Sequence, residues 1–383
     1  MLGLVPRETN QPILWEDFAD SGFATVFEKM QNTPQSPKYH SEGDVWVHTK
    51  MVCEALVGLE EYGELSKKEQ DAVFLSAMLH DIGKTVCTTL RDGEITSPYH
   101  TVKGAVLARG WLWQQFDLAG TKEKQALREA ICMMVKYHSF PTFATVEKDW
   151  QRKMLKIAAN GELTNRFSIK LLYLLSKADV LGRRSQVEDD YKERVECFKM
   201  MAEDVGCFEG PYSFADAFSE RAYFRRQTNW QDDSLWRDTW GEVIMLCGLP
   251  ASGKDTYIAT HLPEMEMISL DAIRERLGIS PTDDQGKVIA AFQSMAKERL
   301  RKKQPFVYNA TNLSKDIRQK QIDLFEKYGA SVKIIFLETP WEEEMARNQS
   351  REAEVPQQAI QRMLQKLEMP ERSESEAVVW DIT

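Results

Sequence analysis

The chain has 383 residues, of which 43% are apolar and 28% charged, and its formal net charge is −10. This length favours two domains over one, and the composition is that of a soluble globular protein. The acidic balance argues against a protein that coats nucleic acid, although it does not exclude an enzyme that grips only a strand end. No stretch is apolar over the length of a membrane span and no signal segment begins the chain, so we expect a cytoplasmic protein. The scattered cysteines contain no C-x-x-C pair, which predicts reduced thiols.

Histidines and one acidic residue mark the ends of several predicted helices in the first part of the chain. The His80-Asp81 pair ends a largely apolar helix, where buried polar groups are costly without a partner, and a metal ion is an efficient partner. Gly83 is expected to stop this helix, and Pro141 to break a later one. Apolar residues spaced three and four apart predict helices at 45–56, 71–81, from 104 onward, 126–138 and 169–179.

These polar residues have an order that resembles a known ligand pattern. In chain order they are His48, His80, Asp81, His100, His138 and Asp179. The order resembles the H…HD…H…H…D set of the HD phosphohydrolase superfamily, and the stretches 38–49 and 80–84 fit it closely. The resemblance implies an all-helical bundle in which the core metal ligands are His48, His80, Asp81 and Asp179. His100 and His138 match extra histidines that hold a second metal in several branches of that superfamily.

The implied chemistry is phosphoester hydrolysis, with Asp81 in the catalytic set. A bound ion lowers the pKa of its water and neutralises charge on a phosphoryl oxygen. Imidazole and carboxylate suit Zn, Mn, Co, Ni or Fe, so the ligand types do not select the metal. Lys84 is a candidate to contact the phosphate, or else a solvated lysine at a helix end. His40 either supports a ligand or lies at the surface. The alternative for the whole set is five structural histidines with ordinary partners.

Turn-forming residues separate two predicted domains. Gly206, Gly210 and Pro211 interrupt a charged, helix-compatible segment, so we expect a first domain at 1–205, a connector at 206–235 and a second domain at 236–383. The aromatic and arginine residues at 223–226 suit binding of a nucleic-acid strand, but such a mixture more often belongs to a helix that packs between domains.

A phosphate-loop pattern, G-x-x-x-x-G-K, occupies residues 248–254, after an apolar stretch at 243–247 that predicts a strand and before a stretch that can open a helix. Backbone N–H groups of such a loop, the helix N-terminus and the lysine bind the phosphates of a nucleotide. Asp255 stands where Ser or Thr usually meets Mg²⁺. A carboxylate can hold Mg²⁺ directly or through water, but it also adds negative charge near ATP, so nucleotide preference stays open. The NTP-binding candidates here are Gly248, Ser252, Gly253, Lys254, Asp255 and Thr256.

Further strands alternate with helices after the loop. Strands are predicted at 266–271, 304–312 and 331–338, and helices at 288–301 and 317–328. This alternation predicts a parallel α/β sheet with its ligands at the carboxyl ends of the strands. Asp271 and residues 309–312 would then face the same crevice as Lys254.

This second part resembles the polynucleotide 5′-kinase branch of P-loop phosphotransferases. The resemblance rests on the loop, Asp271-x-x-Arg274, residues 309–312 and the arginines before Val355-Pro356. It implies that Asp271 is the general base for a 5′-hydroxyl, that Arg274 grips an acceptor phosphate, and that Lys254 and Arg351 take part in catalysis. Arg347 and Arg351 would clamp the donor phosphates from one face of a lid helix. Thr311 and Asn312 are candidates for substrate binding.

Each of these assignments has a plainer alternative. Asp271 would instead cap a helix, and Arg274 would be an ordinary surface residue. Arg347 and Arg351 would be exposed arginines beside the acidic residues 342–344. Thr311 and Asn312 would only shape the turn after a strand.

An HD phosphohydrolase fused to a polynucleotide kinase resembles the bacterial HD-Pnk end-healing enzymes. The resemblance implies phosphorylation of 5′-hydroxyl ends with ATP or another NTP and Mg²⁺, and removal of 2′,3′-cyclic, 2′- or 3′-phosphates with a transition metal. The partners would be RNA ends, with DNA as an alternative, upstream of an RNA ligase. Two other functions stay open: a small-molecule or nucleoside kinase joined to a nucleotide phosphohydrolase, and a nucleotide-sensing regulator with an inactive HD site.

Overall fold

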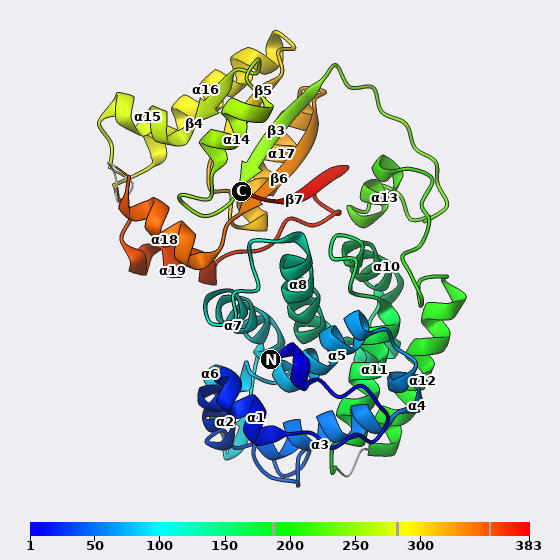
Figure 1. Cartoon of the computed structure of the whole chain (residues 1–383). Helices are drawn as coiled ribbons and strands as arrows, with labels where there is room; N and C mark the ends of the chain where they lie inside the picture. The colour runs from blue at the N-terminus through cyan, green and yellow to red at the C-terminus, as the bar shows by residue number, and fades with distance from the viewer. Residues whose placement is uncertain (186–187, 281–282, 352–353) are drawn as a thin grey trace. The chain divides into compact units, whose positions relative to one another are not determined.

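The computed structural model describes residues 1–383 except 186–187, 281–282 and 352–353. Contacts divide the chain into two compact units, Met1–Leu118 with Glu123–Tyr212, and Ala119–Lys122 with Ser213–Thr383. The first unit is largely helical, and the second is built on a five-stranded sheet (Figure 1). The division after Tyr212 lies within the segment 206–235.

Helices make up most of the first unit, as predicted. They are η1 (Leu2–Leu4), α1 (Trp15–Phe18), η2 (Ala19–Phe23), α2 (Ala24–Gln31), α3 (Val45–Gly58), α4 (Glu60–Gly63), α5 (Lys67–Leu79), α6 (Lys84–Cys87), α7 (His100–Gln114), α8 (Lys122–Tyr137), α9 (Phe140–Phe143), η3 (Ala144–Val146), α10 (Trp150–Gly161), α11 (Ile169–Leu181) and α12 (Glu188–Asp204). The unit is not all-helical, because β1 (Thr89–Arg91) and β2 (Glu94–Thr96) form an antiparallel hairpin. Its turn is Asp92-Gly93, both with positive φ, a pair that favours two-residue hairpin turns.

Three packed helices, α3, α5 and α11, form the core of this unit. Each begins at a side-chain cap: Asp44 for α3, Ser66 in a capping box with Glu69 for α5, and Ser168 for α11. In α5 every residue from 70 to 79 is buried, as expected for a helix enclosed on all sides. The helices predicted at 45–56, 71–81 and 169–179 are therefore confirmed as the core of the bundle.

Two helix ends differ from expectation. Gly83 does not stop α5, which ends at Leu79; it lies in the turn before α6 with a φ of −64°. A glycine is needed there for close packing, because a Cβ would lie 1.9 Å from the carbonyl oxygen of His100. Pro141 does not break α8, which ends at Tyr137. It lies in the first turn of α9, where its missing N–H costs no hydrogen bond.

The second unit alternates strands with helices, which confirms the predicted parallel α/β fold. Its elements are α13 (Ala217–Phe224), β3 (Glu242–Cys247), α14 (Lys254–His261), β4 (Met267–Ser269), α15 (Leu270–Leu277), α16 (Gly286–Arg301), β5 (Phe306–Asn309), α17 (Lys315–Lys327), β6 (Ser331–Glu338), α18 (Trp341–Gln349), α19 (Gln357–Gln365) and β7 (Ala377–Ile382). The strands are all parallel, in the order β4-β5-β3-β6-β7. Since the chain runs from β3 to opposite sides of the sheet, a ligand crevice is expected at the carboxyl end of β3.

Three details of this unit depart from the sequence interpretation. Strand β4 ends at Ser269, so Asp271 lies in the first turn of α15 rather than at a strand end. Strand β7, which pairs with β6, has no counterpart among the predicted strands. Helix α18 ends at Gln349, so Arg351 lies beyond it and does not share a helix face with Arg347.

The mixed segment at 223–226 belongs to α13 and the turn that follows it. Tyr223 is only 4% exposed. Arg225 forms ion pairs with Glu326, at 2.9 Å, and with Asp323. These contacts favour a packing role within the second unit over strand binding.

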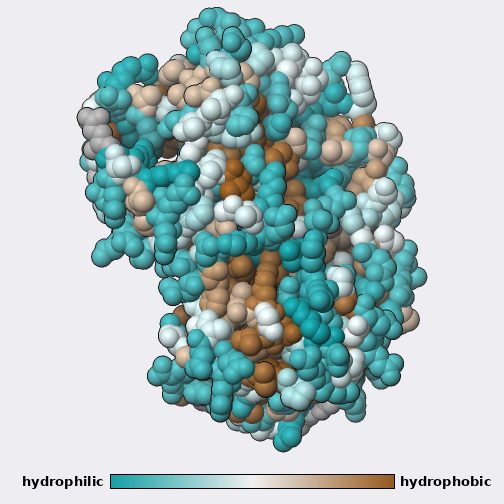
Figure 2. Space-filling model, viewed as in Figure 1, coloured by the Kyte–Doolittle hydropathy of each residue, from teal (hydrophilic) through white to brown (hydrophobic). Residues whose placement is uncertain are grey.

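Polar residues dominate the face of the molecule drawn in Figure 2, with apolar residues gathered over the helices of the first unit. Within the described residues, no helix combines the length and the apolar character needed to cross a bilayer.

Candidate active sites

The six predicted metal ligands lie together in the first unit. They come from α3 and α11, from the start of α7, and from the residues that directly follow α5 and α8: His48, Asp179, His100, His80, Asp81 and His138. They form two groups, His48–His80–Asp179 and Asp81–His100–His138, whose ligand atoms lie within 4.8 Å of one another. The His100 side chain is 24% exposed, whereas the other five are buried. We call these six residues the ligand cluster.

Hydrogen bonds give three histidines of the cluster the same orientation. Nδ1 of His80, His100 and His138 lies 2.8, 3.0 and 2.8 Å from the backbone carbonyl oxygen three residues earlier. Since a carbonyl can only accept, each Nδ1 carries the proton and each Nε2 presents a lone pair. For His48, Nε2 also faces the cluster, 3.3 Å from Nε2 of His80 and 3.0 Å from Asp179 Oδ1.

This geometry fits a divalent cation. Two imidazole lone pairs at 3.3 Å repel each other unless a proton or a cation lies between them. The buried Asp81 Oδ1 has no hydrogen-bond partner among the described residues, which is costly for a carboxylate. His48, His80 and Asp179 would hold one ion, and Asp81, His100 and His138 would hold a second.

Electrostatics favours metal-binding protonation states for Asp81, His100 and His138, whereas His80 binds a proton more tightly than usual. Burial lowers the pKa of His138 to about 3 and also lowers that of His100, so both imidazoles are neutral. Burial acts to raise the pKa of Asp81, but Lys84 and His80 hold it well below its usual value. Burial would also lower the pKa of His80, yet the Asp81 and Asp179 carboxylates and the Ala77 carbonyl together outweigh burial and raise that pKa. A metal ion would displace this proton on binding.

Glu42 is a candidate that the sequence analysis leaves out. Its Oε1 lies 2.9 Å from Nδ1 of both His48 and His40, and its Oε2 accepts from the Arg184 amide at 3.1 Å. Burial acts to raise the pKa of Glu42, but hydrogen bonds from the two histidines lower it well below its usual value. Glu42 thus places a carboxylate at ion-pair distance from His48 Nδ1, which favours a proton on that nitrogen, although the contact lacks hydrogen-bond geometry. The sequence signal that could have indicated Glu42 is its position in the stretch 38–49, which fits the HD pattern closely.

We expect Glu42→Gln to weaken binding of a transition metal about 10- to 100-fold, because partners that orient a metal-bound histidine typically contribute this much. Titration calorimetry of the metal-stripped protein with Zn²⁺ or Mn²⁺ measures the change. The matched control is Glu54→Gln, an exposed glutamate on α3 that should leave affinity unaltered. Equal affinities for Glu42→Gln and the wild type would mean that Glu42 does not orient His48.

Lys84 is buried, so the interpretation as a solvated lysine is wrong. Its ammonium donates to Asp81 Oδ2 at 2.6 Å, Gln35 Oε1 at 2.7 Å and His40 Nε2 at 3.3 Å. These acceptors occupy all three N–H groups. Lys84 is therefore first a partner of Asp81, and contact with a phosphate would require one of these bonds to open.

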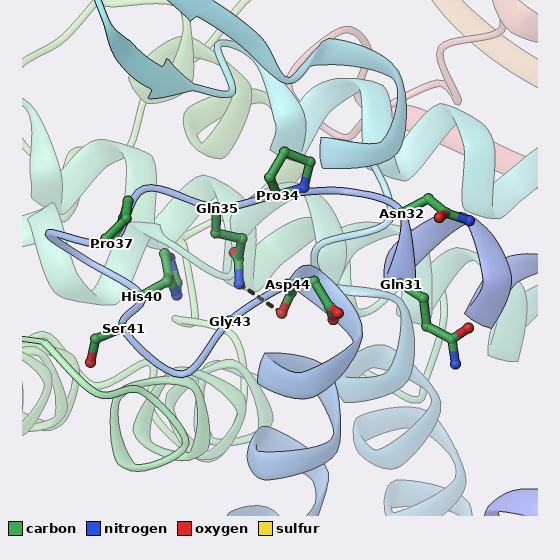
Figure 3. Close-up of a pocket in the computed structure, with 9 residues that line it drawn as sticks. All are labelled: Gln31, Asn32, Pro34, Gln35, Pro37, His40, Ser41, Gly43 and Asp44. Carbon is green, nitrogen blue, oxygen red and sulfur yellow. Dashed lines mark hydrogen bonds between the residues drawn. The ribbon is translucent and has the colours of Figure 1, made fainter.

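His40 and Gln35 also line a pocket of about 460 Å³ in the loop between α2 and α3 (Figure 3). The Gln35 amide points across this loop and donates to the Asp44 carbonyl oxygen at 3.1 Å. Burial lowers the pKa of His40 to about 3, so its ring is neutral. Together with Glu42 and His48, His40 forms a third group close enough to hold a metal. Because its two nitrogens already face Glu42 and Lys84, we assign it the supporting role expected from the sequence.

Arg183 is a second residue that the sequence analysis does not single out. Its guanidinium lies 3.0 Å from both carboxylate oxygens of Asp179. Burial acts to raise the pKa of Asp179, and this arginine holds it well below its usual value. The Arg183 side chain is 15% exposed, so it brings a cation to the edge of the ligand cluster.

The predicted phosphate loop joins β3 to α14. Gly248 has a φ of +146°, and a Cβ there would lie 2.5 Å from the carbonyl oxygen of Leu337, so no other residue fits. The N-terminus of α14 adds a positive end suited to phosphate. The other predicted loop residues follow in order along the loop and the first turn of α14: Ser252, Gly253, Lys254, Asp255 and Thr256.

Lys254 bonds to the oxygens of its own loop. Its ammonium donates to the carbonyl oxygen of Leu249 at 2.6 Å, and lies 3.2 Å from both the Gly248 carbonyl oxygen and Ser252 Oγ. Burial lowers the pKa of this lysine to about 8. A phosphate would replace neutral acceptors with full negative charge and so favour the ammonium.

Asp255 has one defined partner, Asn309 at the end of β5, whose amide donates to Asp255 Oδ1 at 2.7 Å. Within the described residues, Asp255 belongs to no group of three potential metal ligands. A Mg²⁺ ion there would therefore need oxygens from the nucleotide and water to complete its shell.

Asp271 is 77% exposed and forms an ion pair with Arg274, one turn later. Arg274 also donates to Gln285 Oε1 at 2.8 Å. The cap of α15 is Ser269, so the alternative that Asp271 caps a helix is wrong. Asp271 acts to raise the pKa of Lys254 against the effect of burial, as expected for a carboxylate in the same crevice.

Thr311 and Asn312 pack against the phosphate loop. The Thr311 carbonyl oxygen accepts from the Gly248 amide at 3.0 Å. The Asn312 amide donates to the Leu246 carbonyl oxygen at 2.7 Å, and this side chain is 3% exposed. These bonds match the turn-shaping alternative, and binding of substrate by either residue stays a prediction.

Arg347 and Arg351 are placed differently from one another. Arg347 forms an ion pair with Glu343 and lies 3.3 Å from Thr383 Oγ1. Arg351 acts to lower the pKa of Lys254, in the same direction as burial. Arg347 lies in α18 and Arg351 just beyond its end, and both are among the described residues.

Glu344, also on α18, is a buried acid that the sequence analysis counts only as a neighbour of the arginines. It is 0% exposed, and neither carboxylate oxygen has a hydrogen-bond partner among the described residues. Burial raises the pKa of Glu344 to about 8, although Lys254 acts to lower it. The carboxyl group is therefore largely protonated at neutral pH.

We expect the free energy of unfolding to fall as pH rises from about 5 to about 8, because folded Glu344 retains a proton that the unfolded chain releases near its ordinary pKa of 4.5. The fall is at most about 4–5 kcal/mol, at ~1.4 kcal/mol per unit of pKa. Glu344→Gln should remove the contribution of Glu344 and leave that of Glu220, whose pKa burial also raises to about 8, and urea titrations at several pH values measure the change. Glu342→Gln, an exposed neighbour, is the control that should retain the full slope. A slope unaltered in Glu344→Gln would show that Glu344 titrates normally.

The parallel sheet, the phosphate loop after its central strand and the surrounding helices define the second unit as a P-loop kinase-like domain. In agreement, residues 243–370 match the family model AAA_33, described as an AAA domain. This match covers about a third of the chain.

Particular proteins are similar to parts of the chain. A Multifunctional CCA protein from Pasteurella multocida (strain Pm70) is 30% identical over 174 residues, which are 43% of this chain and 36% of that protein. The chain thus spans about a third of the length of this relative. A sugar kinase from Janibacter sp. HTCC2649 is 24% identical over 38% of this chain and 85% of that one, with a TM-score of 0.29. A gluconokinase from Sinorhizobium meliloti 1021 is 23% identical over 38% and 84%, with a TM-score of 0.28.

Proposed function

We propose that this chain is a bifunctional nucleic-acid end-healing enzyme that acts on RNA. Its second unit would phosphorylate 5′-hydroxyl ends with an NTP and Mg²⁺. Its first unit would remove 2′,3′-cyclic, 2′- or 3′-phosphates with a divalent transition metal such as Zn, Mn, Co or Ni. The observation that carries the proposal is a buried cluster of imidazoles and carboxylates on the same chain as a P-loop kinase-like domain. One chain would then act on both termini of a broken strand.

In the first unit, the ligand cluster supports phosphoester hydrolysis. When bound, a metal ion supplies an activated water and neutralises charge on the phosphoryl group. Lys84 keeps Asp81 ionised at 2.6 Å, and Glu42 keeps the lone pair of His48 turned toward the cluster. Arg183, partly exposed beside Asp179, offers a second cation to the phosphate of the substrate.

In the second unit, the residues around the loop suit transfer of a phosphoryl group. Lys254 would exchange the carbonyl oxygens of its loop for the β- and γ-phosphates. Asp271, exposed in the crevice, would accept the proton of the attacking hydroxyl, while Arg274 holds the carboxylate in place and contacts the acceptor phosphate. Arg351 would add positive charge near the transferred group.

The direct experiment uses an RNA oligonucleotide with a 5′-hydroxyl and a 2′,3′-cyclic phosphate. The protein is incubated with it, an NTP, Mg²⁺ and each candidate transition metal, and mass spectrometry follows both ends. We expect a 5′-phosphate that depends on NTP and a lost 3′-end phosphate that depends on the transition metal. These product ends are the ones that an RNA ligase joins. A DNA oligonucleotide in parallel reports the preference between RNA and DNA.

Acceptor competition separates the alternatives. Phosphorylation of free nucleosides or of sugar acids, with none on the oligonucleotide, would replace the proposal with a small-molecule kinase. Binding of NTP without turnover on any acceptor, together with no release of phosphate, would indicate a regulator.

A further inference from the structure

The ligand cluster has one accessible member. His100 is 24% exposed at the side chain, while the side chains of His48, His80, Asp81, His138 and Asp179 are at most 4% exposed. Among the six ligands, His100 is therefore the one that a substrate reaches most readily from solvent. His100 is the first residue of α7, so the residues at the start of α7 form the entrance to this site.

Tyr99 lies at this entrance and has an unusual backbone conformation. It precedes His100 directly and caps α7 with φ 61° and ψ 18°, in the left-handed region that a bulky L-residue rarely adopts. Its side chain is 77% exposed. The backbone turn is closed by Ser97, whose carbonyl oxygen lies 3.0 Å from His100 Nδ1, so the conformation of Tyr99 is tied to the orientation of the metal ligand.

The fold gains little from this tyrosine. Among the contacts that the structure describes, its ring has no hydrogen bond, aromatic contact or cation–π contact, whereas the turn would suit Gly or Asn with less strain. A strained conformation beside a reactive centre is often retained for function. One turn later, the Lys103 amide bonds to the Tyr99 carbonyl oxygen at 3.0 Å, and the Lys103 side chain is also exposed. An aromatic ring next to a lysine is the pairing used to bind single strands.

We propose that Tyr99 is the platform on which the base of the 3′-terminal nucleotide stacks while its phosphate lies at the ligand cluster. The inference rests on the proposed function of the first unit and adds the residue that recognises the nucleoside. Lys103 contacts a phosphate further along the strand. Stacking accepts any base, so this site selects a nucleotide end over a simple phosphoester without reading sequence.

The experiment measures kcat and KM for release of the 3′-end phosphate by the metal-loaded protein. Two RNA substrates are compared, one with an intact terminal nucleotide and one whose terminal nucleotide is abasic. The variants are Tyr99→Ala, Tyr99→Trp and Tyr99→Gly, and Val102→Ala is the control, since Val102 is 50% exposed in the same turn of α7. Quenching of a terminal 2-aminopurine on binding is a readout that does not depend on turnover.

Tyr99→Ala should raise KM for the intact end about 5- to 150-fold, given ~1–3 kcal/mol for stacking of one base. It should leave kcat within about twofold and the abasic substrate unaffected, and it should abolish the quenching. Tyr99→Trp should restore KM. Tyr99→Gly should show the same KM defect with an unchanged or raised Tm, because it relieves the strained turn.

Different results overturn different statements. An unaltered KM in Tyr99→Ala, an equal loss on the abasic substrate, or no rescue by Trp would each refute stacking. A Tm lowered by several degrees in Tyr99→Gly would make Tyr99 structural and also refute it. A wild-type protein that releases no phosphate from either RNA, with any metal, would refute the proposed function itself.

Discussion

Replacing Asp81 with asparagine should abolish release of phosphate from RNA 3′ ends while phosphorylation of 5′ ends continues. Asp81 is the residue that joins the two ligand groups, with Oδ2 3.3 Å from His80 Nε2 and Oδ1 3.5 Å from His100 Nε2. An amide cannot supply the same charge, and it offers an N–H where the cluster needs an acceptor. Because a metal-activated water contributes several kcal/mol to such a reaction, we expect a loss of at least about 10³-fold.

Metal content and hydrolysis are measured together for Asp81→Asn. Elemental analysis of the purified variant should show less bound transition metal than the wild type, and the kinase rate should stay within about twofold. Equal hydrolysis by variant and wild type would place the reaction at another site. A variant that loses both activities while circular dichroism stays native would refute the division of labour between the two units.

Replacing Asp271 with asparagine should have the opposite pattern. The kinase rate on a 5′-hydroxyl RNA should fall about 10²- to 10⁴-fold, the range expected when a general base is lost. Asp271 is 77% exposed in the crevice, so the substitution empties no core, and asparagine still offers Arg274 an acceptor. A large loss of stability is therefore not expected.

Transfer of labelled phosphate from an NTP measures the effect of Asp271→Asn, and release of the 3′-end phosphate should be unchanged. The matched control is Glu275→Gln, an exposed acid one turn further along α15. A kinase rate that survives in Asp271→Asn would assign the proton to another acceptor. A rise in KM for the NTP with an unchanged kcat would instead make Asp271 part of the nucleotide site.

Residues whose chemistry stands out in a pattern could be predicted from the sequence. Histidines at the ends of apolar helices identified the ligand cluster, because a buried helix seldom carries them without a partner. The glycine loop after an apolar strand identified the nucleotide site. In each case a short motif and the secondary structure around it are enough to predict the site, without knowledge of how the helices and strands pack.

Residues whose role depends on packing could not be found in this way. Arg183 is marked as part of the site by its contact with Asp179, and arginines near a helix end are common in any sequence. Glu344 lies in a run of three glutamates, and the buried residues of α18 are the polar Glu344 and Asn348, so no apolar periodicity marks its buried face. The sequence predicts a strand that reaches Asp271 because the apolar Leu270 follows Met267 and Ile268 closely, and this hides the role of Ser269 as the cap of α15.

The bonds of Lys254 also bear on how quickly the protein engages its cosubstrate. The ammonium donates to oxygens of its own loop, and Gly248 packs that loop closely against the neighbouring strand. Because these contacts hold the loop in one shape, we expect little further ordering of the loop when a triphosphate binds. When a nucleotide binds, the Lys254 ammonium would keep its position and exchange the Gly248 and Leu249 carbonyl oxygens for phosphate oxygens.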